Sequence, residues 1–162
     1  MLFAIWIAKK CKIAYIYCDC CYLETFKIVE KYEIAYTVNN IIGFPDETRE
    51  LVFDTINVNR QINPASTNVY FFTPYKGTQL RKYCIDNGYL DKNDKVHQLL
   101  DGVPLKMDSI SYQELKGLQR TFPLYAKMPE DMFGQIKIAE EFDDEGNKTY
   151  ERLKEIFYER YS

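Results

Sequence analysis

The sequence lacks any excess of basic residues and any long hydrophobic run. It has 24 acidic against 21 basic side chains, and Lys and Arg form no cluster. Proteins that grip nucleic-acid phosphates usually carry a basic patch or stripe. The apolar stretch at residues 2–8 is far shorter than the roughly 20 residues that span a bilayer, and its lysines follow it, whereas a secretory signal places them first. We expect no nucleic-acid partner and no membrane partner.

Histidine is scarce, and the cysteines are unevenly placed. His97 is the single histidine, so no second imidazole could share a metal with it, and we interpret it as a surface or loop residue. An odd number of cysteines with four crowded near one end is not typical of a secreted disulfide framework. We therefore expect a cytoplasmic protein in which Cys84 is a core residue. The five cysteines are Cys11, Cys18, Cys20, Cys21 and Cys84.

The 162 residues, 46% of them apolar, are enough for one domain with a substantial core. Residues 1–21 form a divergent leader with no glycine, proline or clear helix cap. Residues 22–90 alternate helical and β-prone patterns, which predicts an α/β fold with parallel strands. Residues 91–162 show no strand alternation and form a predicted helical C-terminal extension.

Two loops share one layout. Residues 39–48 read NNIIGFPDET and residues 71–78 read FFTPYKGT. Each closes a β-prone run with Gly and Pro and then opens an amphipathic helical run. Two successive strand–loop–helix units predict a parallel sheet whose loops gather at one edge, where ligands bind in open α/β sheets and barrels.

The element boundaries follow from capping residues and proline. The pattern predicts helix over residues 22–32, strand over 35–42, and a helix capped by Asp46 with Glu47 in its first turn, which Asn63-Pro64 ends. It then predicts strand over 68–73 and a helix capped by Thr78. In the extension, Ser111 begins a helix that is expected to stop before Pro123. Pro129 begins another helix, residues 143–147 form a turn, and an apolar stripe over 150–161 predicts a last helix.

The residues of the two loops have the chemistry of a ligand site. Gly43 would let backbone approach a bound molecule. Ile41 and Ile42 alternate across the strand, so an apolar side chain at the strand end could pack on a flat heteroaromatic ring, and Tyr75 could project a ring into a pocket. The alternative is a pair of rigid βα turns with capped helices and no ligand.

Both loops also resemble a known family. Residues 40–48 resemble the Ile-x-Gly-x-Pro-x-Glu-Thr signature of radical S-adenosylmethionine enzymes, and residues 72–78 resemble the Pro-Tyr-x-Gly-Thr turn one strand later in those enzymes. Residues 120–125 and 129–140 resemble the C-terminal extension of the cobalamin-binding branch. The resemblance covers about residues 22–160.

The resemblance implies a partial (β/α)6 barrel that holds a [4Fe–4S] cluster and S-adenosylmethionine, with cobalamin as a further cofactor of the full-length protein. The cluster reduces the sulfonium, and the 5′-deoxyadenosyl radical that is released abstracts hydrogen from a small-molecule substrate. In the family the strand end corresponding to Ile41 and Gly43 packs on the adenine, and the second loop lines the same pocket. The implied cofactor-binding residues are Asn39, which replaces a family glycine, Ile41, Gly43, Phe72, Pro74 and Tyr75.

The family's Cys-x3-Cys-x2-Cys cluster motif is absent from the sequence. We therefore assign no catalytic residue and no metal ligand. The chain is expected to supply the last barrel units and to need a separate N-terminal half-barrel chain for radical chemistry. Two alternatives stay open: a non-catalytic interaction module derived from the barrel, and a small metal-binding protein that uses Cys11, Cys18, Cys20 and Cys21.

Overall fold

The structure is a computed structural model that describes residues 26–29, 31–94 and 105–161. Two strands, β1 (Thr37–Ile42) and β2 (Ser66–Phe71), pair in parallel, with Thr37 opposite Ser66 and Ile42 opposite Phe71. Helix α3 (Arg49–Ile62) connects them. The predicted α/β class with parallel strands is therefore confirmed, and the first strand falls within its predicted range.

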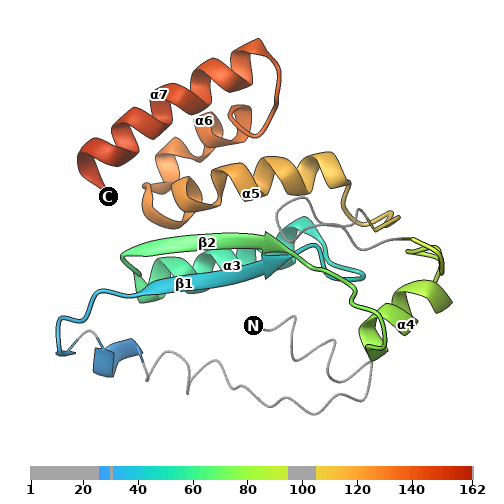
Figure 1. Cartoon of the computed structure of the whole chain (residues 1–162). Helices are drawn as coiled ribbons and strands as arrows, with labels where there is room; N and C mark the ends of the chain where they lie inside the picture. Colours follow the sequence, from blue (N-terminus) through green and yellow to red (C-terminus); the bar gives the residue numbers. More distant parts are fainter. Residues whose placement is uncertain (1–25, 30, 95–104, 162) are drawn as a thin grey trace.

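The remaining elements follow the sheet in the chain. Figure 1 shows α5 lying along the sheet, α6 and α7 beyond it, and α4 near the carboxyl ends of the strands. Residues 26–29 are helical, within the helix predicted over 22–32. The other elements are α4 (Gln79–Asp86), α5 (Tyr112–Lys127), the 3-10 turn η1 (Glu130–Met132), α6 (Phe133–Ile138) and α7 (Asp144–Arg160).

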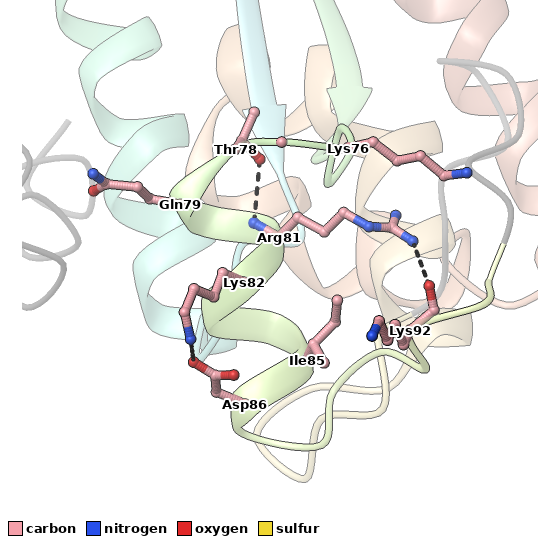
Figure 2. A pocket seen from close by; sticks show the side chains of 9 residues that line it. Lys76, Thr78, Gln79, Arg81, Lys82, Ile85, Asp86 and Lys92 are labelled. Atoms are coloured by element: carbon pink, nitrogen blue, oxygen red, sulfur yellow. Dashed lines mark hydrogen bonds and ion pairs between the residues drawn. The ribbon is translucent and has the colours of Figure 1, made fainter.

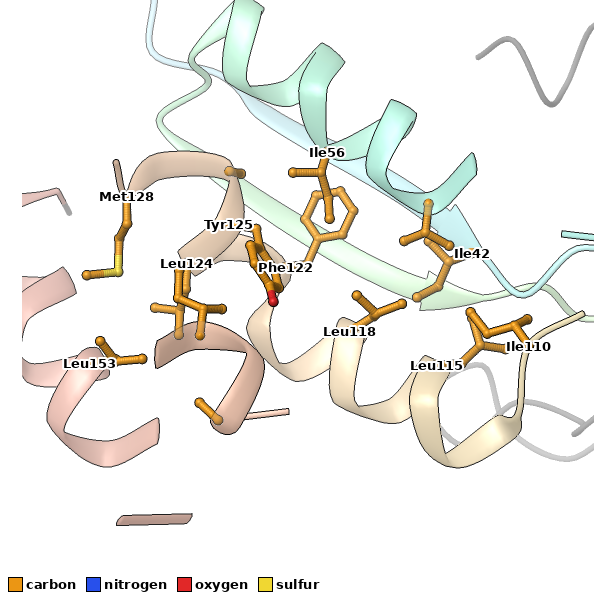
Figure 3. Packing of buried hydrophobic residues seen from close by; sticks show 14 of the residues in the cluster. Ile42, Ile56, Ile110, Leu115, Leu118, Phe122, Leu124, Tyr125, Met128 and Leu153 are labelled. Carbon is orange, nitrogen blue, oxygen red and sulfur yellow. The ribbon is translucent and has the colours of Figure 1, made fainter. Parts of the chain in front are cut away.

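Helices cover one face of the sheet. Along β1 the side chains of Val38, Asn40 and Ile42 are buried, whereas those between them are exposed. The buried face meets α3 and α5 in one core, in which Ile42, Ile56 and Phe122 have no exposed surface. Figure 3 shows these side chains packed between the sheet and the two helices. The alternation predicted for Ile41 and Ile42 is present, since Ile41 lies on the other face and is 49% exposed.

The start of α3 differs from the prediction. Thr48, not Asp46, caps the helix, and its hydroxyl oxygen accepts a hydrogen bond from the Leu51 amide at 3.4 Å. Asp46 instead adopts a left-handed backbone conformation with φ of 62°, and its carboxylate accepts hydrogen bonds from the hydroxyls of Tyr83 and Tyr89. Several residues within a few positions could cap this helix, and tertiary partners decide which one does.

Two predictions in the extension are wrong. Helix α5 does not stop before Pro123 but continues through it to Lys127. Phe122 and Tyr125, on either side of that proline, are fully buried, and their packing outweighs the missing backbone hydrogen bond. Residues 143–147 are not a turn. Asp143 caps α7 by accepting a hydrogen bond from the Gly146 amide at 2.7 Å, and the acidic residues after it suit the positive end of the helix dipole.

Other boundary predictions are confirmed. Asn63 ends α3 in a left-handed conformation, Thr78 caps α4, and Ser111 caps α5. Strand β2 begins two residues before its predicted start at 68. Cys84 is fully buried, as expected. The other four cysteines and His97 lie outside the described residues.

A buried ion network ties α3 to the extension. Arg49 of α3 bonds to the carboxylate of Glu140, which follows α6, at 2.5 Å, and the Tyr125 hydroxyl donates to the same carboxylate at 2.6 Å. Burial alone would raise the pKa of Glu140, but hydrogen bonds from Arg49, Tyr125 and Lys137 outweigh it and lower that pKa below its ordinary value. Glu140 therefore stays ionised in the core.

None of the helices in the described ranges could cross a membrane.

Candidate ligand site at the sheet edge

The two loops do gather at one edge of the sheet. The Phe72 amide, at the end of β2, donates to the carbonyl of Ile42 at 2.7 Å, so the parallel pairing continues into the loops. The rings of Phe44 and Phe72 stack with centroids 4.9 Å apart. The sequence prediction that the loops lie side by side at the carboxyl ends of the strands is therefore confirmed.

Glu47 organises the first loop from within. Its side chain is buried, and its carboxylate accepts hydrogen bonds from the amides of Gly43 and Phe44, the latter at 3.2 Å. Its own carbonyl accepts a hydrogen bond from the Ser109 hydroxyl at 2.6 Å. Burial raises the pKa of Glu47 to about 7, although the two backbone hydrogen bonds oppose that rise. The carboxyl group therefore titrates near neutral pH.

Sequence reasoning missed this role, because Glu47 was assigned to the first turn of α3. It precedes the helix cap and turns back toward the loop. The spacing of Gly43 and Glu47 carried the signal, since a glycine followed by an acidic residue four positions later can close a small loop through backbone N–H groups.

Gly43 has a backbone reason to be glycine. Its φ is +82°, a conformation that side-chain-bearing residues rarely adopt. A Cβ at this position would lie 3.4 Å from the Leu115 side chain and 3.8 Å from that of Phe71. A Cβ on Gly43 would therefore point into the core, toward Leu115 and Phe71. The amide of Gly43 is already hydrogen-bonded to the Glu47 carboxylate.

The face of the sheet opposite α3 and α5, here called the open sheet face, carries Asn39 and Ile41. No helix of the described ranges packs on these two side chains, which are both exposed. The Asn68 amide donates to the side-chain oxygen of Asn39 at 3.0 Å, and Tyr70 stands opposite Ile41 in the register. The face consists of Thr37, Asn39 and Ile41 on β1 and Ser66, Asn68 and Tyr70 on β2.

The second loop places its residues differently. Phe72 and Pro74 are buried, and Phe72 belongs to a small apolar cluster with Cys84, Leu90 and Leu105. Tyr75 is 51% exposed. The six residues assigned to a cofactor pocket thus fall into three groups. Asn39 and Ile41 lie together on the open sheet face, and Tyr75 lies at the surface. Gly43, Phe72 and Pro74 are buried.

A wide basic groove of about 680 Å³ adjoins this second loop along α4. Figure 2 shows Lys76, Arg81 and Lys92 around it. Arg81 is buried and donates to the carbonyls of Pro74, Lys92 and Asp94 at 3.0, 3.3 and 2.9 Å. Its guanidinium therefore fastens the loop to the segment after α4, while the lysines give this edge a positive rim.

The described residues do not hold a metal centre. Within 26–29, 31–94 and 105–161, no three His, Cys, Asp or Glu side chains gather closely enough to bind an ion. The carboxylate of Asp46, in the first loop, is engaged by the hydroxyls of Tyr83 and Tyr89. These residues therefore do not fit a cluster of iron and sulfide.

Comparison with known proteins gives one informative similarity. The chain is 31% identical over 99 residues to the uncharacterized methyltransferase PH0819 of Pyrococcus horikoshii, a match that covers 60% of this chain and 21% of that protein. The chain thus spans about a fifth of the length of the curated relative it matches. No family model matches the sequence, and no solved structure matches it either.

Proposed function

We propose that this chain supplies one wall of an S-adenosylmethionine site, as the last two βα units and helical tail of a radical S-adenosylmethionine barrel of the cobalamin-associated branch. The rest of the barrel would come from another part of the protein or from a partner chain. The observation that carries the proposal is the open sheet face, which ends in the exposed Ile41 at the carboxyl edge of two parallel strands.

The layering of the sheet supports this proposal. In a (β/α) barrel the helices cover the outside and the other face of each strand points to the interior. Here α3 and α5 cover one face only. The open sheet face would then belong to the barrel interior, where its mixture of one aliphatic side chain and several amide and hydroxyl groups suits a mostly flat polar ligand.

The choice of S-adenosylmethionine rests on two supports. The loop motifs resemble those of the radical enzymes, and the Pyrococcus protein is named a methyltransferase. Most biological methyl transfers use this sulfonium as the methyl donor, so both supports point to the same cofactor class. Radical chemistry is the finer part of the proposal and rests on the motifs.

Each residue of the edge would have a distinct task. Ile41 would pack its side chain on the adenine ring, and the amide of Asn39, already aligned by Asn68, would offer a hydrogen-bonding group next to it. Glu47 would keep the first loop in shape by holding two of its amides. In the enzyme family a [4Fe–4S] cluster supplies the reducing electron. The described residues do not supply the ligands of that cluster.

The proposal is tested by calorimetry with S-adenosylmethionine. The purified chain is titrated alone and after reconstitution with a separate N-terminal half-barrel chain. Ile41→Asp places a charge on the open sheet face without touching the core, and we expect it to weaken binding at least tenfold, about 1.4 kcal/mol. Thr37→Asp introduces the same charge on the same face at the other end of β1 and should leave the affinity within twofold.

Two results would count against the proposal. One is binding that Ile41→Asp leaves unchanged. The other is a stably folded, monomeric chain that never binds the cofactor in either setting, which would favour the interaction module instead. Stoichiometric iron or zinc that is lost on Cys18→Ser or Cys20→Ser would favour the small metal-binding protein.

A further inference from the structure

A second cavity lies away from the sheet edge described above. It has a volume of about 310 Å³, within the range of small-molecule sites. It is formed where β2 begins, between the second half of α5 and α7, which Figure 1 shows converging at the end of the sheet opposite the loops. Its lining residues are Ala65, Ser66, Thr67, Arg120, Pro123, Leu124, Lys127, Tyr150, Lys154, Phe157 and Tyr158.

The lining combines rings with cations and contains no acidic residue among those that the structure describes. Three aromatic side chains of α7, Tyr150, Phe157 and Tyr158, supply flat surfaces. Three basic side chains, Arg120, Lys127 and Lys154, supply positive charge. Planar rings stack on such surfaces, and cations beside them select for a negative group on the ligand.

Two of these cations lack a compensating acid within the described part of the chain. Lys127 donates to the neutral side-chain oxygen of Asn63 at 2.6 Å, and partial burial lowers its pKa. Arg120 donates to Asn147 and to the Gly146 carbonyl, and it stacks on the ring of Tyr150 at 4.1 Å. Among the residues that the structure describes, no carboxylate oxygen lies within 4 Å of either cation. The third cation, Lys154, is paired with Glu151 at 3.0 Å.

The lining also contains unsatisfied polar atoms. Thr67 Oγ1 and Arg120 Nε are both buried and have no hydrogen-bond partner in the described part of the chain. Buried polar atoms are normally paired, so the wall of this cavity is incompletely satisfied by the described residues.

We propose that this cavity binds a small molecule that has a flat ring and one anionic group. The ring lies against the aromatic side chains of α7, and the anion lies among Lys127, Arg120 and Lys154, which all line the cavity. The site is separate from the proposed cofactor wall, because it opens at the amino ends of the strands while Ile41 and the loops lie at the carboxyl ends. It therefore does not depend on the proposed function.

The test is calorimetry on the complete chain with two pairs of probes. Indole-3-acetate and phenyl phosphate carry the ring and the charge, whereas tryptophol and phenol carry the ring alone. We expect the two anions to bind at least tenfold more tightly than their neutral counterparts. The preference should be lost at high salt, because it is electrostatic.

Matched variants locate the binding. Lys127→Met keeps the aliphatic stem and removes the charge, and Lys154→Met does the same on the facing helix. Each should weaken anion binding at least fivefold. Lys82→Met makes the same change on α4, far from the cavity, and should leave it unchanged. Thermal unfolding of each variant checks that it remains folded.

The proposal is overturned if no probe binds at millimolar concentration, if charged and neutral probes bind equally, or if Lys127→Met and Lys82→Met behave alike. Should Lys127→Met unfold because it loses the contact with Asn63, Lys154→Met decides the outcome on its own. Binding that the Lys154 variant leaves unchanged would then reject the site.

Discussion

Glu47→Gln should remove a pH dependence of stability that this chain otherwise shows between about pH 4.5 and pH 7. Glu47 is buried, and its pKa rises from 4.5 to about 7 in the folded protein. The folded state therefore binds the proton more tightly than the unfolded state does. The stabilisation from this proton is complete below pH 4.5 and is lost as the pH rises through 7.

The size of the effect follows from the shift. At about 1.4 kcal/mol per pKa unit, the free energy of unfolding should fall by about 3 kcal/mol across this interval because of Glu47 alone. Glutamine has nearly the same shape, can still accept from the amides of Gly43 and Phe44, and does not titrate. In Glu47→Gln this component of the pH dependence should be absent.

The assay is urea unfolding at several pH values from 4.5 to 8, followed by far-ultraviolet circular dichroism. The difference between the native chain and Glu47→Gln isolates this group, since the other titrations are common to both. Glu155→Gln, an exposed glutamate on α7, serves as the control and should leave the profile unchanged. The reasoning would be refuted if the difference in free energy of unfolding between the native chain and Glu47→Gln stayed constant with pH, or if it shifted in favour of the native chain as the pH rises. Either result would show that Glu47 is not a buried carboxyl group with a raised pKa.

Three further predictions concern the helical extension, each measured as a change in the free energy of unfolding at pH 7. Glu140→Gln should cost about 2 kcal/mol, because it removes the buried carboxylate that accepts from Arg49, Tyr125 and Lys137 and leaves Arg49 only its contact with Glu114 among the described acids; a loss below 1 kcal/mol would contradict the network. Gly146→Ala should cost about 2 kcal/mol or more, since a Cβ there would lie 2.1 Å from a backbone carbonyl oxygen. The control Gly134→Ala places its methyl group in open space and should be neutral or stabilising. Equal effects of the two substitutions on the free energy of unfolding would argue against the close packing at Gly146. Asp143→Ala should cost about 1 kcal/mol as the loss of a helix cap, and restoration by Asn at the same position would confirm the cause.

The sequence predicted local structure well where one chemical rule acted alone. Thr78 and Ser111 were identified as caps because each stands just before a helical pattern, and Asn63 because it precedes proline at the end of one. The parallel arrangement of the strands followed from the repeated strand–loop–helix order, which leaves few other topologies.

The sequence failed where long-range contacts override local preference. Pro123 lies inside α5 because its neighbours are buried on the sheet, and nothing in the local pattern shows which helix face will be covered. Asp46 was a good cap on local grounds, but two tyrosines from α4 and the segment after it claim its carboxylate. Such partners lie about 40 residues away in the chain, beyond the reach of a local pattern.

The candidate site was predictable in outline only. The sequence correctly placed the two loops at one edge and put Ile41 on the face opposite Ile42. It did not show that Glu47 holds the first loop or that Gly43 turns toward Leu115. The second fact depends on how α5, more than 60 residues later in the chain, packs across the end of the first strand. The first is a local loop closure between residues three and four positions apart.

The sequence resemblance divides this chain into predicted barrel units and a C-terminal extension, but the ion network joins α3 to the helices after residue 111 in one structure. Arg49 and Glu140 come from the two portions, and the same core contains Ile56 from one and Phe122 from the other. A version shortened near residue 104 would keep both strands but lose eleven of the fifteen buried residues that form this core in the described part of the chain. The two portions are therefore expected to unfold together in a single transition. A substitution that destabilises one portion should then destabilise the other as well.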